Sequence, residues 1–140
     1  MKAYSEKDLE ILAKTIYGEA RGELYRYGIA SLIAVANVVA NRVEKNFAAT
    51  VRDVCLAPNQ FSCWNANDPN FQKLKSLTTD CSIFRKCLEV AENVLEGKWP
   101  DLTDGCDHYH SRDVKPYWAA HLEPKRIFGR HYFYNLKDRK

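Results

Sequence analysis

The stretch Tyr17-Gly18-Glu19-Ala20-Arg21-Gly22-Glu23 places two glycines and two carboxylates between two segments with helical patterns. Glycine costs roughly 1 kcal/mol relative to alanine inside a helix, so this spacing indicates a place where the backbone is approached closely. A carboxylate at a helix end, half covered by apolar side chains, is the setting in which a glycosidase keeps its acid. We therefore expect a functional site here; the alternative is a solvated corner between two helices.

The segments on either side predict a mainly helical domain. Ser5 and Asp8 form an approximate capping box, and apolar residues over 9–16 recur at helical spacing. A nearly continuous apolar segment over about 27–43 is typical of a central helix packed on most sides. We expect further helices over residues 51–55, 69–77 and 81–96, the last capped by Asp80.

The chain changes character after Pro100. Asp104-Gly105 is a turn signal, residues 107–110 suit a short strand, and residues 127–134 are rich in aromatic side chains. We expect a small β or irregular part there. Residues 1–140 are thus predicted to form a single domain of the mainly α (α+β) class, with a central apolar helix.

Composition narrows the class of protein. Hydrophobic residues make up 46% of the chain, enough for a core, and the net charge of +3 is too small to imply nucleic acid. The polar N-terminus predicts no secretory signal peptide, and no apolar run reaches the roughly 18 residues that span a membrane. We expect a monomer made in the cytoplasm; if it works outside, another component must release it.

Charge and cysteine patterns add two expectations. Residues 125–140 hold six Lys or Arg against one acid, a tail that favours anionic surfaces or is simply a frayed, solvated terminus. The five cysteines include no CxxC pair, which argues against a disulfide framework and a structural zinc site. We expect most of them to be buried as small apolar residues.

Three polar segments can line a common groove: residues 17–23, 60–65 and 108–112. Flat aromatic faces, which suit sugar rings, come from Trp64, Tyr109, Tyr117 and Trp118. Short hydrogen-bonding side chains come from Gln60, Asn65, Asn67 and Ser111. This mixture indicates a carbohydrate ligand, although aromatic residues also serve as core.

Two functions of other classes remain open. Cys106, His108 and His110, with His121 or His131, are the sequence-local metal candidates, and three such ligands plus a water would make a zinc amidase or peptidase. The spacing matches no strong metal motif, so we assign no metal and no cofactor. The other alternative is a non-catalytic wall-binding protein.

Several blocks, in order, resemble the cell-wall hydrolase family that includes the spore-cortex-lytic enzymes. They are residues 15–23 (TIYGEARGE), 35–43 ending in NRV, 50–54 (TVRDV), 60–62 (QFS) and 127–134 (IFGRHYFY). The resemblance covers about residues 9–135. It implies a lysozyme-like fold, cleavage of the peptidoglycan glycan strand, lytic transglycosylase chemistry in some members, and Glu19 as the catalytic glutamate.

The chain also departs from that family. We expect neither a signal peptide nor a separate peptidoglycan-binding domain, and the segment Gly105–His110 is bulkier and more polar than the small-residue stretch usual there in the family. A phage endolysin or a small bacterial autolysin fits these features better than a role in spore germination.

The mechanism expected from these residues is cleavage of the MurNAc-β-1,4-GlcNAc bond, with Glu19 as general acid and a raised pKa. A hydrolase needs a second carboxylate, for which Glu23, Asp104 and Asp107 are candidates, whereas a transglycosylase needs only Glu19. Glu23 can instead pair with Arg21, Arg26 or Arg42.

Two polar segments are expected to form opposite walls of the groove. The segment 60–62 is assigned to substrate binding, with Gln60 and Ser62 facing Glu19 and Phe61 beneath them. Glu23 and Trp64 are also expected to bind the sugar. Tyr109 is expected opposite as a catalytic assistant, and His110 as a weaker substrate contact because strand alternation sends it to the other face.

Overall fold

The computed structural model describes residues 4–137. The elements follow one another as α1 Glu6–Ala20, α2 Glu23–Tyr27, α3 Ala30–Glu44, α4 Val51–Leu56, η1 Ser62–Trp64, α5 Pro69–Ser76, α6 Ser82–Leu95, β1 His108–Ser111, η2 Tyr117–Ala119, β2 Arg126–Phe128 and β3 His131–Tyr134. The mainly helical class with a small C-terminal β part, expected from the sequence, is confirmed.

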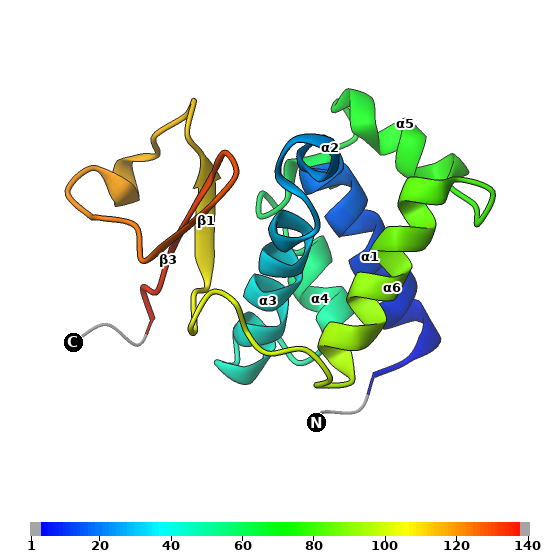
Figure 1. The fold of residues 1–140 in the computed structure, drawn as a ribbon, viewed down its shortest axis with the longest axis horizontal. Helices are drawn as coiled ribbons and strands as arrows, with labels where there is room; N and C mark the ends of the chain where they lie inside the picture. The colour runs from blue at the N-terminus through cyan, green and yellow to red at the C-terminus, as the bar shows by residue number, and fades with distance from the viewer. Residues whose placement is uncertain (1–3, 138–140) are drawn as a thin grey trace.

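Helix α3 is the centre of the molecule. Figure 1 shows it between the sheet on one side and the pair α1 and α6 on the other. Toward the helices, Leu32 and Val35 are fully buried together with Leu12 and Ile16 of α1. Toward the sheet, α3 contributes to a second apolar cluster that contains Phe133. A helix covered on two sides needs the continuous apolar character of this segment.

The sheet has three antiparallel strands in the order β1-β3-β2. Tyr109 of β1 lies opposite Phe133 of β3, and Ile127 of β2 lies opposite Tyr132. Side chains alternate between the two faces of a strand. One face of the sheet therefore meets α3 and the other carries His108 and His110.

The helix boundaries differ from expectation in two places. The capping box of Ser5 and Asp8 is confirmed. The central helix, expected from about residue 27, begins instead at Ala30, because Gly28 has φ +79 and ends the short α2 that precedes it. Asp80 was the wrong cap: the N-cap of α6 is Cys81, and the Asp80 backbone N–H is held by Thr78 Oγ1 in the preceding turn.

The C-terminal cations within the described residues are not a frayed end. Lys125 and Arg126 pair with Asp104, Arg130 pairs with Glu23, and Lys137 bonds to the Lys45 carbonyl. Arg139 and Lys140 of the basic tail lie outside the described residues. Within residues 4–137, no helix combines the length and apolar character needed to cross a bilayer.

Candidate active site

A cavity of about 430 Å³ opens where the three polar segments meet. It is lined by the end of α1, the loop around η1, the central helix and strands β1 and β3. The lining residues are Gly18, Glu19, Arg42, Asn59, Gln60, Ser62, Asn65, Tyr109, His110, Ser111 and His131. Segments 90 residues apart in the chain are thus brought to one site, as expected from the sequence.

Gly18 lets the η1 segment, which contains Cys63, approach the end of α1. A Cβ added at Gly18 would lie 2.5 Å from the Cβ of Cys63, which no real pair of such atoms tolerates. The expected close approach is therefore confirmed at this glycine. Gly22 has nothing within 4 Å of the same added atom, so the expectation is wrong there.

Glu19 lies in the last turn of α1 and is largely covered. Burial raises its pKa, and this effect outweighs the hydrogen bonds from Tyr109 and Cys63, which lower it. Within residues 4–137 Glu19 has no ion-pair partner, and it is the one carboxylate among the residues lining the cavity. The site therefore favours a protonated carboxyl at this position.

Tyr109 is the direct partner of Glu19. Its hydroxyl donates to Glu19 Oε1 at 2.5 Å, and its ring stacks on Phe133 with centroids 5.3 Å apart. Burial, together with the nearby Glu19 charge, raises the Tyr109 pKa well above its usual value. The hydroxyl thus stays a hydrogen-bond donor, in the position expected from the sequence.

Arg42 joins the cavity to the strand behind it. Its side chain is 5% exposed, Nη1 donates to Gln60 Oε1 at 3.1 Å, and Nε donates to the Asp107 carbonyl at 2.7 Å. From the sequence, Arg42 was expected only as one candidate partner of Glu23 and not as part of the groove. A charged residue inside an otherwise apolar helix was the signal that could have found it, because buried cations are rare unless paired.

His131 is the second lining residue that sequence reasoning missed as part of the groove. It is 8% exposed, and its ring meets the Tyr109 ring edge-on at 5.1 Å. Burial lowers its pKa, so the imidazole is favoured in its neutral form, and its buried Nδ1 has no hydrogen-bond partner among residues 4–137. Its position next to Tyr109 depends on the pairing of β1 with β3, which residue types alone do not reveal.

The loop residues divide as expected. Gln60 and Ser62 line the cavity with Glu19, whereas Phe61 is 2% exposed and packs beneath, 6.4 Å from the Tyr109 ring. Phe61 is therefore support for the wall, which corrects its assignment as a substrate contact. The substrate-binding roles of Gln60 and Ser62 stay predictions.

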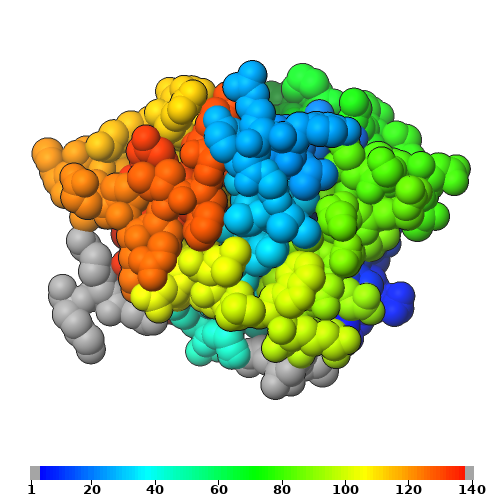
Figure 2. Space-filling view, viewed as in Figure 1, coloured from blue at the N-terminus to red at the C-terminus, as the bar shows by residue number. Residues whose placement is uncertain are grey.

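Two residues assigned to substrate lie elsewhere. Trp64 is not among the lining residues: its indole Nε1 donates to Thr15 Oγ1 at 2.9 Å and its ring packs against the main core. Glu23 is 4% exposed and accepts from the Arg130 backbone N–H at 2.8 Å. Figure 2 shows the blue α2 region directly against the orange-red C-terminal hairpin, where this bond forms. Neither residue lines the cavity with Glu19, and the partner of Glu23 is Arg130, not one of the three arginines expected.

His110 reaches the cavity edge, but its imidazole is engaged on the other face of the sheet. Nε2 bonds to the Tyr134 hydroxyl at 2.8 Å, Nδ1 bonds to the Ser111 carbonyl, and the ring stacks on Tyr134. The alternation expected for this strand therefore holds. A substrate contact through this imidazole would require breaking these bonds.

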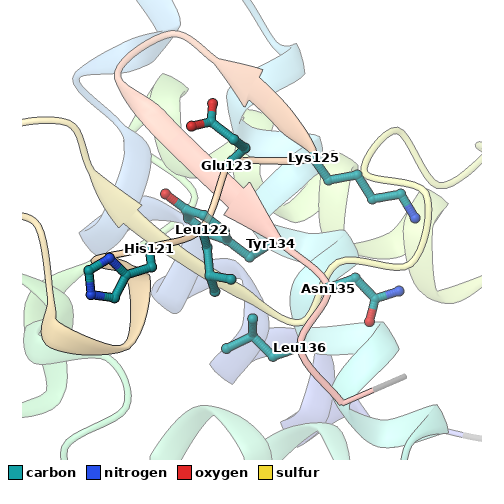
Figure 3. A pocket seen from close by; sticks show the side chains of 7 residues that line it. All are labelled: His121, Leu122, Glu123, Lys125, Tyr134, Asn135 and Leu136. Atoms are coloured by element: carbon teal, nitrogen blue, oxygen red, sulfur yellow. The ribbon is translucent and has the colours of Figure 1, made fainter. Parts of the chain in front are cut away.

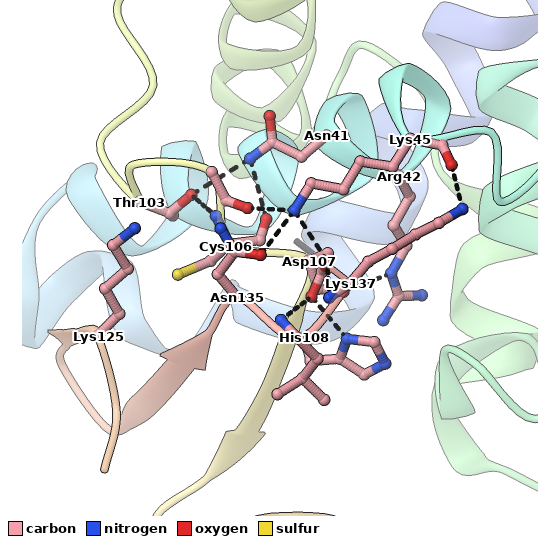
Figure 4. Close-up of polar contacts among 12 residues, drawn as sticks. Asn41, Arg42, Lys45, Thr103, Cys106, Asp107, His108, Lys125, Asn135 and Lys137 are labelled. Carbon is pink, nitrogen blue, oxygen red and sulfur yellow. Dashed lines mark hydrogen bonds and ion pairs between the residues drawn. The ribbon is translucent and has the colours of Figure 1, made fainter. Parts of the chain in front are cut away.

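The other two carboxylates considered as a second catalytic group are engaged elsewhere. Asp104 pairs with Lys125 and Arg126. Asp107 is fully buried and accepts from Lys45 Nζ at 2.9 Å and from the backbone N–H groups of residues 136 and 137. Figure 4 shows these bonds converging on Asp107, with His108 Nδ1 on its remaining side. We name this group, Asp107 with Lys45 and His108, the Asp107 cluster.

The residues of the zinc alternative are not assembled into a site. No group of three or more His, Cys, Asp or Glu within residues 4–137 is placed to hold a metal ion. Cys106 is buried against Phe133, His108 belongs to the Asp107 cluster, and His110 faces Tyr134. All five cysteines are free, and four of them are buried, as expected.

A second cavity, of about 530 Å³, is larger, but three of its polar lining residues are bonded to other parts of the chain. It lies between the loop after η2 and the end of β3, as Figure 3 shows. Lys125 is held by Asp104, Asn135 accepts from Lys45, and the Tyr134 hydroxyl is bonded to His110. Glu123 is exposed, so this cavity has no carboxylate in the setting that Glu19 occupies.

The fold is shared with two solved catalytic domains. The catalytic domain of the germination-specific lytic transglycosylase SleB from Bacillus anthracis superposes with a TM-score of 0.74 at 24% identity, covering 95% of this chain and 98% of that one. The crystal structure of the Bacillus cereus SleB catalytic domain gives a TM-score of 0.69, also at 24% identity, over 95% of this chain and 93% of that one. At this identity the likeness establishes the fold.

Sequence comparison gives relatives that are much longer than this chain. The spore cortex-lytic enzyme of Halalkalibacterium halodurans is 38% identical over 135 residues, which is 94% of this chain and 36% of that protein. The spore cortex-lytic enzyme of Bacillus cereus is 40% identical over 60 residues, 42% of this chain and 22% of that protein. The chain thus spans about a third or less of the length of these curated relatives.

A family model described as Cell Wall Hydrolase matches residues 28–134. The match includes Arg42, Gln60, Tyr109 and His131 of the cavity, and Glu19 precedes it. Because the match spans well over half of the chain, the protein belongs to the cell wall hydrolase family.

Proposed function

We propose that the protein cleaves the glycan strand of peptidoglycan at the MurNAc-β-1,4-GlcNAc bond, as a lytic transglycosylase with Glu19 as general acid and base. The observation that carries this proposal is a buried carboxyl with a raised pKa, bonded to a tyrosine hydroxyl, as the one carboxylate lining a polar cavity. The spore cortex-lytic enzymes among the relatives and the transglycosylase with the same fold support this choice of substrate.

The reaction follows from one carboxyl acting twice. Glu19 donates its proton to the glycosidic oxygen as the bond from that oxygen to C1 breaks, leaving an oxocarbenium-like sugar. The Glu19 carboxylate then takes the proton of the same sugar's 6-hydroxyl as that oxygen attacks C1. The products are an anhydro ring on one side and a free 4-hydroxyl on the other, and no water is consumed.

Tyr109 assists Glu19 in both steps. Its hydroxyl holds Oε1 at 2.5 Å and so fixes the direction in which the other carboxyl oxygen faces the substrate. It also stabilises the carboxylate that exists between the two proton transfers. Since the Tyr109 pKa is raised, the hydroxyl donates and does not compete as a base.

A muramidase mechanism has less support. A second carboxylate would have to lie about 5–5.5 Å from Glu19 for retention or about 6.5–9.5 Å for inversion with a water between them. Glu23, Asp104 and Asp107 are each bonded to cations or backbone groups outside the cavity. The cavity itself supplies Glu19 alone.

Mass spectrometry of purified peptidoglycan after digestion tests the proposal. We expect anhydro-muramic ends. Reducing ends would show hydrolysis, freed peptides with whole glycans would show an amidase, and binding to walls without any cleavage would show a wall-binding protein. Each of these three results overturns the transglycosylase assignment.

We also propose that the protein acts as a monomer on the wall, as a phage endolysin or small autolysin that reaches its substrate after release from the cytoplasm. Size-exclusion chromatography with light scattering tests the monomer. Expression with and without a holin tests the route: lysis that needs no membrane opening would contradict it.

A further inference from the structure

We propose that Arg42 is a positioning residue: it fixes the side-chain amide of Gln60 with its NH₂ group toward the cavity, where that group donates to the acetamido carbonyl oxygen of a bound sugar. This inference rests on the proposed function, because it takes an N-acetylated glycan as the ligand. It assigns a role in substrate recognition to Arg42 on α3 and Gln60 in the loop before η1.

The guanidinium of Arg42 is held on several sides. Nε donates to the Asp107 carbonyl at 2.7 Å, and the rings of Phe47 and Phe61 lie 5.6 and 5.3 Å from its central carbon. The side chain is 5% exposed and leaves the most buried helix of the molecule. Arg42 is therefore a fixed point from which Nη1 reaches Gln60 Oε1 at 3.1 Å.

The chemistry of the two groups decides which end of the amide is presented. An arginine side chain has five N–H donors and no acceptor, so it can bond only to the carbonyl oxygen of an amide. With Oε1 directed at Arg42, the opposite end of the Gln60 amide is its NH₂ group, a donor of two protons. Gln60 lines the cavity together with Glu19, so this donor belongs to the site.

The matching group on a peptidoglycan strand is the acetamido carbonyl. Sugar hydroxyls both donate and accept, and so they adapt to either end of an amide. The acetamido carbonyl oxygen only accepts, and it is the neutral acceptor of this kind that every sugar of the strand carries. The Gln60 NH₂ group, held in place by Arg42, therefore favours a sugar with an acetamido group. A sugar without this group cannot accept the hydrogen bond, and the donor is left unpaired in the complex.

The experiment measures binding in a Glu19→Gln background, so that no cleavage intervenes. The ligands are peptide-free glycan strands, either N-acetylated or chemically de-N-acetylated, and the Kd values are measured by calorimetry. We expect the parent to prefer the N-acetylated strand by roughly tenfold. Adding Gln60→Glu keeps an acceptor for Arg42 but removes the NH₂ donor, so the preference should vanish or reverse.

Asn65→Asp, in the same background, is the matched control. It makes the same amide-to-acid change at another residue lining the cavity, and so reproduces the added charge. We expect it to retain the N-acetyl preference. Equal loss of the preference in both variants would assign the effect to charge and overturn the inference, as would a Gln60→Glu variant that keeps the preference.

The role of Arg42 needs a separate readout. In the active enzyme, Arg42→Lys keeps the positive charge but not the planar donor pair that bonds both Gln60 and Asp107. We expect KM to rise several-fold with kcat nearly unchanged, because the amide contact is made equally in the ground and transition states. A fall in kcat with unchanged KM would overturn the positioning role. If the variant does not fold, the Gln60 comparison still decides the inference, whereas a parent enzyme that cuts no glycan overturns the proposed function itself.

Discussion

The Glu19 cavity and the Asp107 cluster each bury a carboxylate, and they lie on either side of Arg42. Burial opposes the charge in both places. At Asp107, hydrogen bonds from His108, Lys45 and two backbone N–H groups overcome burial and hold the pKa well below its usual range. At Glu19, one tyrosine and one cysteine do not overcome it, and the pKa is raised.

The difference shows that the supply of donors, rather than burial, separates a structural carboxylate from the proposed catalytic one. Lys45 is directed at Asp107, and Arg130 is directed at Glu23. Arg42, the cation nearest the cavity, is turned toward a carbonyl and an amide. Glu19 is left with neutral donors, which keep it oriented and allow it to stay protonated.

The largest expected effect is the loss of cleavage in Glu19→Gln. The amide still accepts from Tyr109 but has no proton to give, and general acid catalysis contributes about 10²–10⁴-fold. We expect release of glycan fragments to fall by at least this factor, with an unchanged circular dichroism spectrum. A variant that keeps more than a tenth of the activity would end the assignment of Glu19 as the acid.

Asp107→Asn should affect stability instead of chemistry. It removes the buried charge that faces the partly buried Lys45, and breaking such a pair costs about 3 kcal/mol. Because the folded pKa of Asp107 is lowered, its stabilisation is present above about pH 4 and is lost as the pH falls through the folded pKa. Denaturant unfolding should therefore show a difference between wild type and variant that shrinks in acid.

Glu19→Gln gives the opposite pH dependence in the same measurement. The folded pKa of Glu19 is raised, so the stability it contributes is present below about pH 4 and is lost as the pH rises through the folded pKa. The glutamine variant lacks this loss and should match wild type in acid and exceed it at neutral pH. Parallel pH curves for the two variants would contradict the opposite pKa shifts of Asp107 and Glu19.

Tyr109→Phe should lower kcat by about tenfold, the effect of one hydrogen bond of about 1.4 kcal/mol in the transition state. The phenyl ring keeps the packing on Phe133, so stability should change little. The lost bond also lowered the Glu19 pKa, so the alkaline limb of the activity profile should move to higher pH. Unchanged kinetics would reduce Tyr109 to a packing residue.

The smallest effect is expected from the basic tail. Replacing Arg139 and Lys140 with Gln should weaken lysis of whole walls a few-fold at low salt and leave cleavage of soluble glycan fragments unchanged, because surface attraction is screened over about 8 Å at physiological ionic strength. Lys137→Gln is the contrasting variant, since Lys137 lies over the Phe47 ring and bonds to the Lys45 carbonyl. Equal losses on both substrates would show that the tail supports the fold.

The errors of sequence reasoning concern side chains whose partners lie far away in the chain. Trp64 has the composition of a sugar-stacking residue, but its indole finds Thr15, 49 residues earlier. Glu23 looks equivalent to Glu19, but Arg130 approaches it from 107 residues away. Gly129 makes that approach possible, since a Cβ there would lie 2.3 Å from the Glu23 carboxylate. Local spacing carries no information on such partners.

The sequence by itself determined the helical periodicity, the apolar central helix, the polar segments of the groove and the acid at the end of α1, because each depends on neighbouring residues and intrinsic geometry. Only the tertiary structure decided the charge state favoured at each carboxylate and the orientation of the Gln60 amide. These depend on which donors arrive from distant segments and how much water they exclude, and both quantities are set when α3, the η1 loop and the sheet pack together.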